Sequence, residues 1–392
     1  MTQQVVVIGG GAVGAACALF LRRLDPTIAV TVVEPDPTLR WASSARSAAS
    51  IRQQFSNELN VRLSQFGLQL LREPEAWLAV GHERVDLGFV ESGYLILATG
   101  DAGAQLLRDS HAVQRAAGAP VVLLDARGLR ERLPWMHGDD VALASLGLGG
   151  EGWFDGQRLA QALARKARSL GAEWHTAHVT SFDLAAGTVR ALGCSDGRRV
   201  EADAFVLAAG AWSHAVGALV GLEVPVFGRR RTVFVFSCPT PLPRTPLVAD
   251  PSGVWFRSEG AGFIGGWTPG EADPDPDDPP LDQPDLHQFD ERVWPALAHR
   301  VPAFEALRRT GAWDGWYEVH PLDHNALVGP HPHCANLLLA CGFSGHGLQH
   351  AAGVGRGIAE WVVHGSWRTL DLSPLTPARV LTGQAWVERA II

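Results

Sequence analysis

Lysine is nearly absent from this sequence of 392 residues. Lys166 is the only lysine among 33 basic residues, and all the others are arginine. The codon bias of a GC-rich bacterial genome is a sufficient explanation for this replacement. Its consequence is chemical, because a reaction that requires a buried lysine would have only Lys166 to supply it.

Long apolar stretches, paired cysteines and excess positive charge are absent as well. No run of about 18 apolar residues occurs, so we expect no integral membrane segment. Residues 1–4 lead directly into an apolar run, so we expect no signal peptide. The five cysteines form no C-x-x-C pair and favour a reducing, cytoplasmic setting. The formal net charge of −8 argues against a nucleic-acid partner.

The beginning of the sequence carries a glycine fingerprint. Residues 5–8 are apolar and predict a buried parallel strand, and residues 12–24 predict a helix. Between and within these elements, Gly9 allows a tight turn, Gly11 lets the backbone approach a pyrophosphate, and Gly14 lets the helix pack close to the strand. The pattern is typical of dinucleotide binding, with a simple glycine-rich turn as the alternative.

The helix start and the next strand complete this dinucleotide site. Ala12 and Val13 open the helix, whose free N–H groups and dipole favour phosphate. Residues 29–33 predict a second strand that ends at Glu34, the usual position of a carboxylate that binds ribose hydroxyls. An acid at this position disfavours a 2′-phosphate, so the fingerprint indicates FAD or NAD rather than NADP.

The pattern of elements along the chain predicts two interleaved domains. Apolar runs that predict buried strands, each followed by a glycine turn, recur at both ends of the sequence. Residues 225–318 instead show the alternating pattern that predicts the strands of another kind of sheet. We predict a discontinuous cofactor domain of residues 1–75, 150–224 and 320–392. The substrate domain is then formed by residues 76–149 and 225–319.

Two groups of potential metal ligands favour plainer interpretations. Residues 273–278 alternate acids with prolines, which favours a solvated loop over a calcium site. His331, His333 and Cys334 lie in a short segment before a predicted strand. We predict no metal site at either place.

A second glycine-rich segment, residues 342–349, reads Gly-Phe-Ser-Gly-His-Gly-Leu-Gln. With the fingerprint, residues 43–48 (Ser-Ser-Ala-Arg-Ser-Ala) and residues 207–212 (Leu-Ala-Ala-Gly-Ala-Trp), it makes the chain resemble the FAD-dependent amine and amino-acid oxidoreductases. That superfamily includes glycine oxidase, sarcosine oxidase and D-amino-acid dehydrogenases. The resemblance extends over nearly the whole chain, and residues 46–55 are most similar to the FAD-dependent oxidoreductase domain branch, close to the sarcosine and dimethylglycine enzymes.

The resemblance implies an α/β fold (α+β overall), with a Rossmann-like FAD-binding domain and an inserted mixed or antiparallel β-sheet substrate domain. It also implies cofactor contacts. The phosphates or the flavin edge would be lined by Ser43, Ser44, Arg46 and Ser47. Val179 would hold the adenine through its backbone, and the segment beneath the nucleotide would comprise Ala209, Gly210 and Trp212. A helix N-terminus would approach flavin N1 and the C2 carbonyl through Gly342, Gly345, His346, Gly347, Leu348 and Gln349. A purely structural turn is the alternative for each glycine and serine.

One departure from the family pattern concerns the substrate carboxylate. Glycine oxidase and D-amino-acid dehydrogenases carry an arginine after a W-x-G-x stretch, which clamps the carboxylate. Here residues 313–316 are followed by Tyr317. Arg52 is the remaining candidate for contacting substrate or flavin, with an ordinary ion pair as the alternative. His346 lies in the flavin-facing turn and completes the candidate catalytic set.

A second departure concerns oxygen and covalent attachment. Sarcosine oxidases carry a lysine near the flavin that helps to activate O2, and a cysteine bonded to the cofactor. Ile264 stands at or near the lysine position, and no cysteine directly precedes Tyr317. No histidine occurs near Trp41, where dimethylglycine-type enzymes attach their flavin. We therefore expect non-covalent FAD in a dehydrogenase or a slow oxidase.

These features predict an FAD-dependent oxidoreductase that oxidises the C–N bond of a secondary amine or amino acid of sarcosine-like, N-alkyl or D-amino-acid type. Hydride would pass to flavin N5, and water would hydrolyse the imine. The electron acceptor and the oligomeric state stay open. One alternative is a flavoprotein with an assembly or electron-transfer role. Another is a NAD-dependent or hydroxylating enzyme, which residues 342–349 disfavour.

Overall fold

The computed structural model describes residues 2–270 and 272–390 and contains two large sheets. The first has six strands in the order β19-β20-β13-β1-β2-β9. All neighbouring pairs in it are parallel except β19 with β20. Its strands are β1 (Gln4–Ile8), β2 (Ala29–Val33), β9 (Glu173–His175), β13 (Ala204–Leu207), β19 (Leu327–His331) and β20 (Cys334–Cys341).

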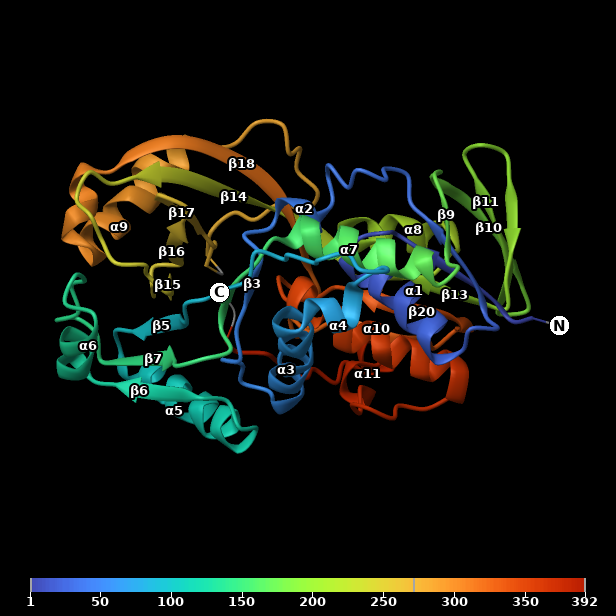
Figure 1. Cartoon of the computed structure of the whole chain (residues 1–392), viewed down its shortest axis with the longest axis horizontal. Coiled ribbons are helices and arrows are strands. Elements are labelled where there is room, and N and C mark those ends of the chain that lie inside the picture. Colours follow the sequence, from blue (N-terminus) through green and yellow to red (C-terminus); the bar gives the residue numbers. More distant parts are fainter. Residues whose placement is uncertain (1, 271, 391–392) are drawn as a thin grey trace.

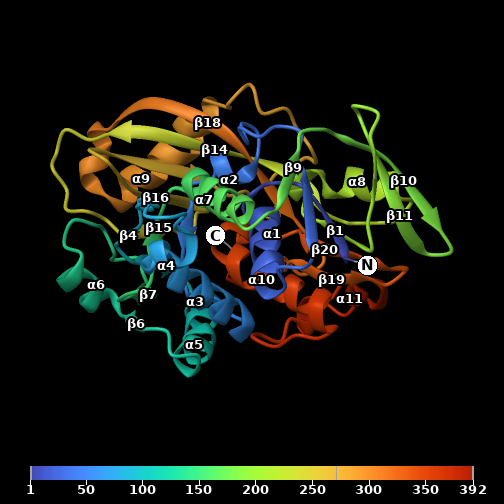
Figure 2. The ribbon, with the colours of Figure 1, turned by 45° about the vertical axis from the view of Figure 1, so that its right-hand side comes forward.

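Small residues allow three helices to pack closely beside this sheet. α1 (Ala12–Leu24) contacts both α10 (Gly347–His364) and α7 (Gly156–Ser169), and Figure 2 shows α1 beside α10. A Cβ added to Gly355 of α10 would lie 2.6 Å from the carbonyl carbon of Ala16 in α1, so the two helix backbones nearly touch. The same layer contains α3 (Glu58–Arg72), α4 (Pro74–Leu78) and α11 (Ala378–Thr382).

The second sheet has eight strands in the order β18-β14-β17-β16-β15-β5-β7-β6 and forms the other lobe in Figure 1. Its neighbouring strands are antiparallel except for β15 with β5. The strands are β5 (Tyr94–Ala98), β6 (Val121–Leu124), β7 (Leu143–Gly147), β14 (Phe227–Ser237), β15 (Leu247–Ala249), β16 (Val254–Glu259), β17 (Gly262–Trp267) and β18 (Arg308–Val319).

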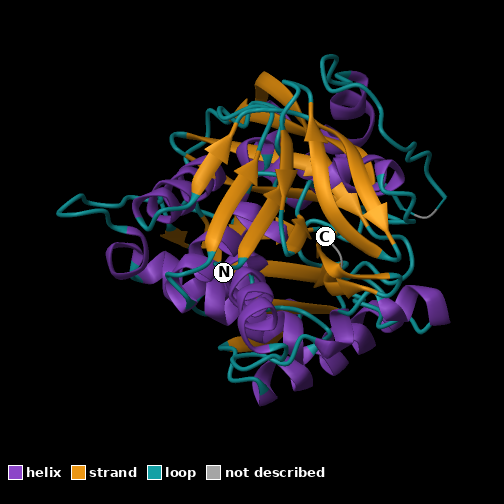
Figure 3. Cartoon of the chain, turned by 90° about the vertical axis from the view of Figure 1, so that its right-hand side faces the viewer, coloured by secondary structure: helices purple, strands orange, loops and turns teal. Residues whose placement is uncertain are grey.

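Helices cover this sheet around a second core. The phenylalanines of β14, β16 and β17 pack on α9 (Trp294–Arg300) and the turns beside it. The remaining helices of this lobe are α5 (Asp101–Ala116) and α6 (Ala126–Arg132). Figure 3 shows the strands of both sheets massed through the middle of the molecule, with the larger helices below them.

Small elements complete the chain. A three-stranded antiparallel sheet projects at the far end of the first lobe in Figure 1 and comprises β10 (Val179–Ala185), β11 (Thr188–Cys194) and β12 (Arg199–Glu201). Another short sheet contains β3 (Ser50–Ile51), β4 (Val90–Glu91) and β8 (Gly152–Trp153), and two further helices are α2 (Ser43–Arg46) and α8 (Ser213–Leu219). Among the helices that the structure describes, none has the length and apolar character needed to cross a membrane.

In the acidic loop, residues 274 and 276–278 are exposed, and several of its acids are also bonded to β14. Asp275 forms a bidentate pair with Arg231 at 2.8 Å, and Asp277 pairs with Arg229. Asp278 accepts a 2.9 Å hydrogen bond from the Gly228 N–H. The loop is therefore tied to β14, because three consecutive arginines of that strand supply a local excess of positive charge.

Candidate functional site

A cavity of about 820 Å³ lies at the carboxyl ends of the parallel strands and extends to the eight-stranded sheet. The segments that follow β1, β2, β13 and β20 all reach it. Ligands of open α/β sheets bind at such strand ends. The far wall comes from the other sheet and includes Arg231, Val233, Trp255 and Thr268.

The cavity brings together nearly all the residues predicted from the sequence. Its lining includes Gly9, Gly11, Ala12, Val13, Glu34, Ser43, Ser44, Arg46, Ser47, Arg52, Val179, Ala209, Gly210, Trp212, Tyr317, Gly345, His346, Gly347, Leu348 and Gln349. Gly14 and Gly342 lie behind this wall. A Cβ on Gly14 would collide with the Gly9 carbonyl, and one on Gly342 would lie 2.9 Å from the Val226 side chain.

The first glycine turn has the geometry that its spacing predicts. Gly9 has φ +100°, and an added Cβ would lie 2.8 Å from the carbonyl carbon of Ala208. A Cβ on Gly11 would meet only Ser44 Oγ, at 3.3 Å, so this backbone is open on the cavity side. Ser44 Oγ also accepts a 3.1 Å hydrogen bond from the Ala12 N–H at the start of α1.

Glu34 is fixed at the edge of the cavity by two backbone donors. Its carboxylate accepts hydrogen bonds of 2.7 Å from the Gly10 N–H and 2.9 Å from the Asp36 N–H. Burial raises the pKa of Glu34, and these two donors oppose the rise. The carboxylate is thus oriented beside the glycine turn while one side of it still faces the cavity.

The second glycine turn is built around Tyr317. Its hydroxyl donates a 2.6 Å hydrogen bond to the Ser344 carbonyl, and its ring lies beneath the guanidinium of Arg231 at 5.0 Å. Ser344 and Gly345 have φ +47° and +84°, respectively. This left-handed backbone turns the chain from β20 into α10, whose first residues line the cavity.

Glu318 supports the same turn and was not among the residues predicted for the site. Its carboxylate accepts a 3.1 Å hydrogen bond from the Gly342 N–H, and it also lines the cavity. Burial raises the pKa of this carboxyl to about 7. The only sequence signal was an acid directly after Tyr317, and its partner lies 24 residues further along the chain.

Arg52 and His346 form a buried pair at the cavity wall. Arg52 is 2% exposed, and its Nη2 lies 3.2 Å from His346 Nε2. The guanidinium also contacts the carbonyls of Gln54 and Ala390 and the ring of Phe55, and it interacts electrostatically with the buried carboxyl of Glu151. Burial, and next the positive charge of Arg52, hold the pKa of His346 well below its ordinary value, so the imidazole is neutral.

The structure also shows where the residues that depart from the family pattern lie. Ile264 is 2% exposed and is not among the cavity-lining residues, although it shares a sheet face with Val235 and Arg257. Lys166 lies on α7 and donates to the Ala79 carbonyl at 2.6 Å. Within the described part of the chain, neither lysine nor cysteine lines the cavity.

Comparison with known proteins establishes the class. The family profile described as "FAD dependent oxidoreductase" matches residues 4–361, so the chain belongs to that family. The expected fold class and FAD as cofactor are thereby confirmed. The cavity fits this cofactor, because two helix N-termini and the open backbone at Gly11 border it.

Particular relatives are similar over nearly the whole chain. A bovine (Bos taurus) FAD-dependent oxidoreductase domain-containing protein 1 is 40% identical, over 99% of this chain and 87% of the relative. The structure of L-proline dehydrogenase from P. horikoshii superposes with a TM-score of 0.84 and 25% identity, covering 98% of this chain and 99% of the other. Glycine oxidase from Geobacillus kaustophilus gives a TM-score of 0.78 with 25% identity, over 96% and 98% of the two chains. The 40% identity is to an animal protein, so it lends no support to a bacterial origin.

Proposed function

We propose that this protein oxidises the C–N bond of a secondary amine or an amino acid of sarcosine-like, N-alkyl or D-amino-acid type. The observation that carries the proposal is Arg52, a buried guanidinium at the cavity wall that no carboxylate of the described residues contacts directly. A substrate carboxylate could bind this guanidinium in a bidentate manner. FAD, when bound, supplies the hydride acceptor at N5.

The electrostatics of the cavity wall favour an uncharged amine. Arg52 is cationic, whereas the neighbouring His346 is neutral because its pKa is strongly lowered. A positive wall stabilises a carboxylate and destabilises an ammonium group. The amine would therefore lose its proton on binding, which leaves its lone pair free for C–H cleavage.

Aromatic side chains support the binding of a small amine. Tyr94, Tyr317 and Trp255 line the cavity together with Arg52. Burial raises the pKa of both tyrosine hydroxyls, so they remain protonated. The Tyr94 hydroxyl lies 3.1 Å from Ser50 Oγ, and that of Tyr317 donates to Ser344. Both rings are thus held in place and exclude water from one side of the site.

We also propose non-covalent FAD and slow reaction with O2. Neither cysteine nor lysine is present among the described residues that line the cavity. All five cysteines are unpaired, which supports a reducing, cytoplasmic setting. The electron acceptor would then be a quinone or an electron carrier rather than O2.

The test is anaerobic reduction of the purified yellow protein by sarcosine, N-methyl amino acids, D-amino acids and proline analogues, followed by admission of air. Bleaching of the flavin by one of these compounds, with slow recovery in air, is the expected result. Fast recovery would contradict the dehydrogenase assignment. Failure of every compound to bleach a flavin that dithionite does bleach would instead favour the assembly or electron-transfer role.

A further inference from the structure

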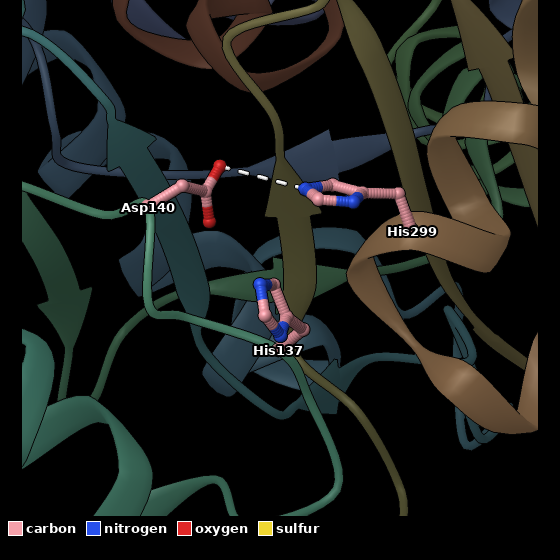
Figure 4. A group of neighbouring side chains, drawn as sticks. All are labelled: His137, Asp140 and His299. Carbon is pink, nitrogen blue, oxygen red and sulfur yellow. Dashed lines mark ion pairs between the residues drawn. The ribbon is translucent and has the colours of Figure 1, made fainter.

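Two histidines and an aspartate meet on the lobe of the eight-stranded sheet, away from the cavity. Their side chains offer one ligand atom each, from His137, Asp140 and His299, and these atoms all lie within 4.8 Å of one another. Figure 4 shows Asp140 facing His299, with the His137 ring below them and one of its nitrogens turned toward the pair. None of the three lines the cavity.

The separation of the carboxylate and one imidazole is close to that of two ligands on a shared metal ion. Asp140 Oδ2 and His299 Nε2 form an ion pair at 3.6 Å, which is longer than an ordinary hydrogen bond (Figure 4). Tetrahedral Zn²⁺ with bonds of about 2.0–2.1 Å separates two ligand atoms by about 3.3–3.4 Å. The two imidazole rings meet at an angle of 63° with their centres 5.1 Å apart, so they converge without stacking.

Arg300 forms hydrogen bonds with Asp140 and His137 on the buried side of the cluster. Its guanidinium donates to both Asp140 oxygens, at 2.8 and 3.0 Å, and it is 2% exposed. The backbone N–H of His137 donates to the Arg300 carbonyl, and Arg300 Nη1 donates to the backbone carbonyl of His137, both at 2.8 Å. His299 precedes Arg300 in α9. Supporting bonds of this kind orient ligands in natural metal sites.

The local charge also favours a cation. Arg300 is shared by two carboxylates, because its Nε donates to Asp250 at 2.7 Å. Two negative charges surround one positive charge, which leaves an excess of negative charge beside two imidazoles. Each carboxylate oxygen of Asp140 has two lone pairs. When one of them accepts a hydrogen bond from Arg300, the second is free to bind a metal ion.

We propose that His137, Asp140 and His299 bind a divalent transition-metal ion of the Zn²⁺ type, with water completing the coordination. Two imidazoles and one carboxylate are ligands that Zn²⁺ accepts, and three protein ligands leave a position for water. The ion links the segment between α6 and β7 to α9. Its role is to join the β7 end of the eight-stranded sheet to the helix layer that covers β14, β16 and β17.

The test is titration of the chelator-treated, flavin-loaded protein with Zn²⁺ by calorimetry. We expect one ion per chain and a rise in Tm on binding. Replacement His137→Ala or His299→Ala should weaken the affinity by about 100-fold or more, since losing only an outer-shell partner costs about 10–100-fold. His287→Ala, which removes an exposed histidine of the same lobe outside the cluster, should bind as the parent does.

Unchanged affinity in the double variant H137A/H299A would overturn the proposal, as would the absence of any Zn²⁺ binding to the parent. A second group, His175, Cys194 and Asp196, also has ligand atoms within 4.8 Å of one another. Loss of binding in His175→Asn with retention in the double variant would assign the ion there instead and reject this site. Flavin bleaching by substrate is measured on the same samples, so the outcome is independent of the proposed oxidation.

Discussion

The Tyr317 ring occupies the space into which a side chain on residue 345 would project. A Cβ added to Gly345 would lie 2.7 Å from both Cζ and Oη of Tyr317. The hydroxyl of the same ring holds the Ser344 carbonyl at 2.6 Å, so the ring cannot move away without breaking that bond. Tyr317 therefore fixes the turn that presents the N-terminus of α10 to the cavity.

We predict that Gly345→Ala lowers the free energy of unfolding more than a matched glycine replacement elsewhere. Gly365 has a similar φ, +66° against +84°, but a Cβ there meets no atom within 4 Å. Gly365→Ala should cost about 1–2 kcal/mol for the left-handed backbone alone. Gly345→Ala should cost about 1–3 kcal/mol more because of overpacking, and it should lower the flavin content. Urea unfolding and flavin absorbance measure both effects, and equal losses for the two variants would refute the steric role of Tyr317.

Glu318 is expected to control flavin retention through the backbone. Glu318→Ala leaves the Gly342 N–H without its acceptor, which costs about 1–3 kcal/mol. Glu318→Gln retains an acceptor oxygen and should keep more flavin than the alanine variant. Flavin released on dilution is the measurement, and equal release from the two variants would argue against this hydrogen bond.

Because of the same carboxyl, we expect the free energy of unfolding to depend on pH. The pKa of Glu318 is raised by burial to about 7, above its ordinary value of 4.5. The folded state therefore binds more protons between pH 4.5 and 7, and this contribution to stability is lost as the pH rises through that window. Glu318→Gln should remove this slope from the unfolding free energy.

For His350 we expect the free energy of unfolding to depend on pH with the opposite sign. Burial, and next the charge of Arg52, lower its pKa from 6.5 to about 3, and it lies 3.2 Å from Ser64 Oγ. Between pH 3 and 6.5 the unfolded chain binds the extra proton, so stability falls on acidification by up to about 1.4 kcal/mol per pH unit. His350→Gln should flatten the urea-midpoint profile below pH 6.5. The exposed His364→Gln serves as control, and a parent-like slope in H350Q would contradict the assignment.

Local sequence patterns were sufficient to predict those parts of the structure that depend on residues close together in the chain. The strand, turn and helix around Gly9 and the carboxylate of Glu34 follow from local spacing, and the structure places them together. Distant pairings were not predictable in this way. Arg52 contacts Ala390, 338 residues away, and Asp275 pairs with Arg231, 44 residues away. Composition alone indicated a solvated loop but not its ion pairs, because nothing local indicates which arginines the acids will meet.

Arg52 is expected to bind the substrate carboxylate. Arg52→Lys keeps the charge but loses the planar fork, and Arg52→Gln loses both. Removing one partner of a buried charge pair costs about 2–3 kcal/mol, so KM for an N-methyl amino acid should rise by about 30–150-fold in Arg52→Gln. Arg52→Lys should lie between this variant and the parent.

An amine of similar size without a carboxylate provides the internal control. Arg52 also donates to the Gln54 and Ala390 carbonyls, so a structural role would impair both compounds alike. A binding role raises KM for the carboxylated substrate in both variants. With the plain amine, Arg52→Lys keeps the positive charge and should leave the flavin reduction rate close to that of the parent. Rapid-mixing measurements of flavin reduction with both compounds decide between the two roles, and parallel losses would reject the carboxylate contact.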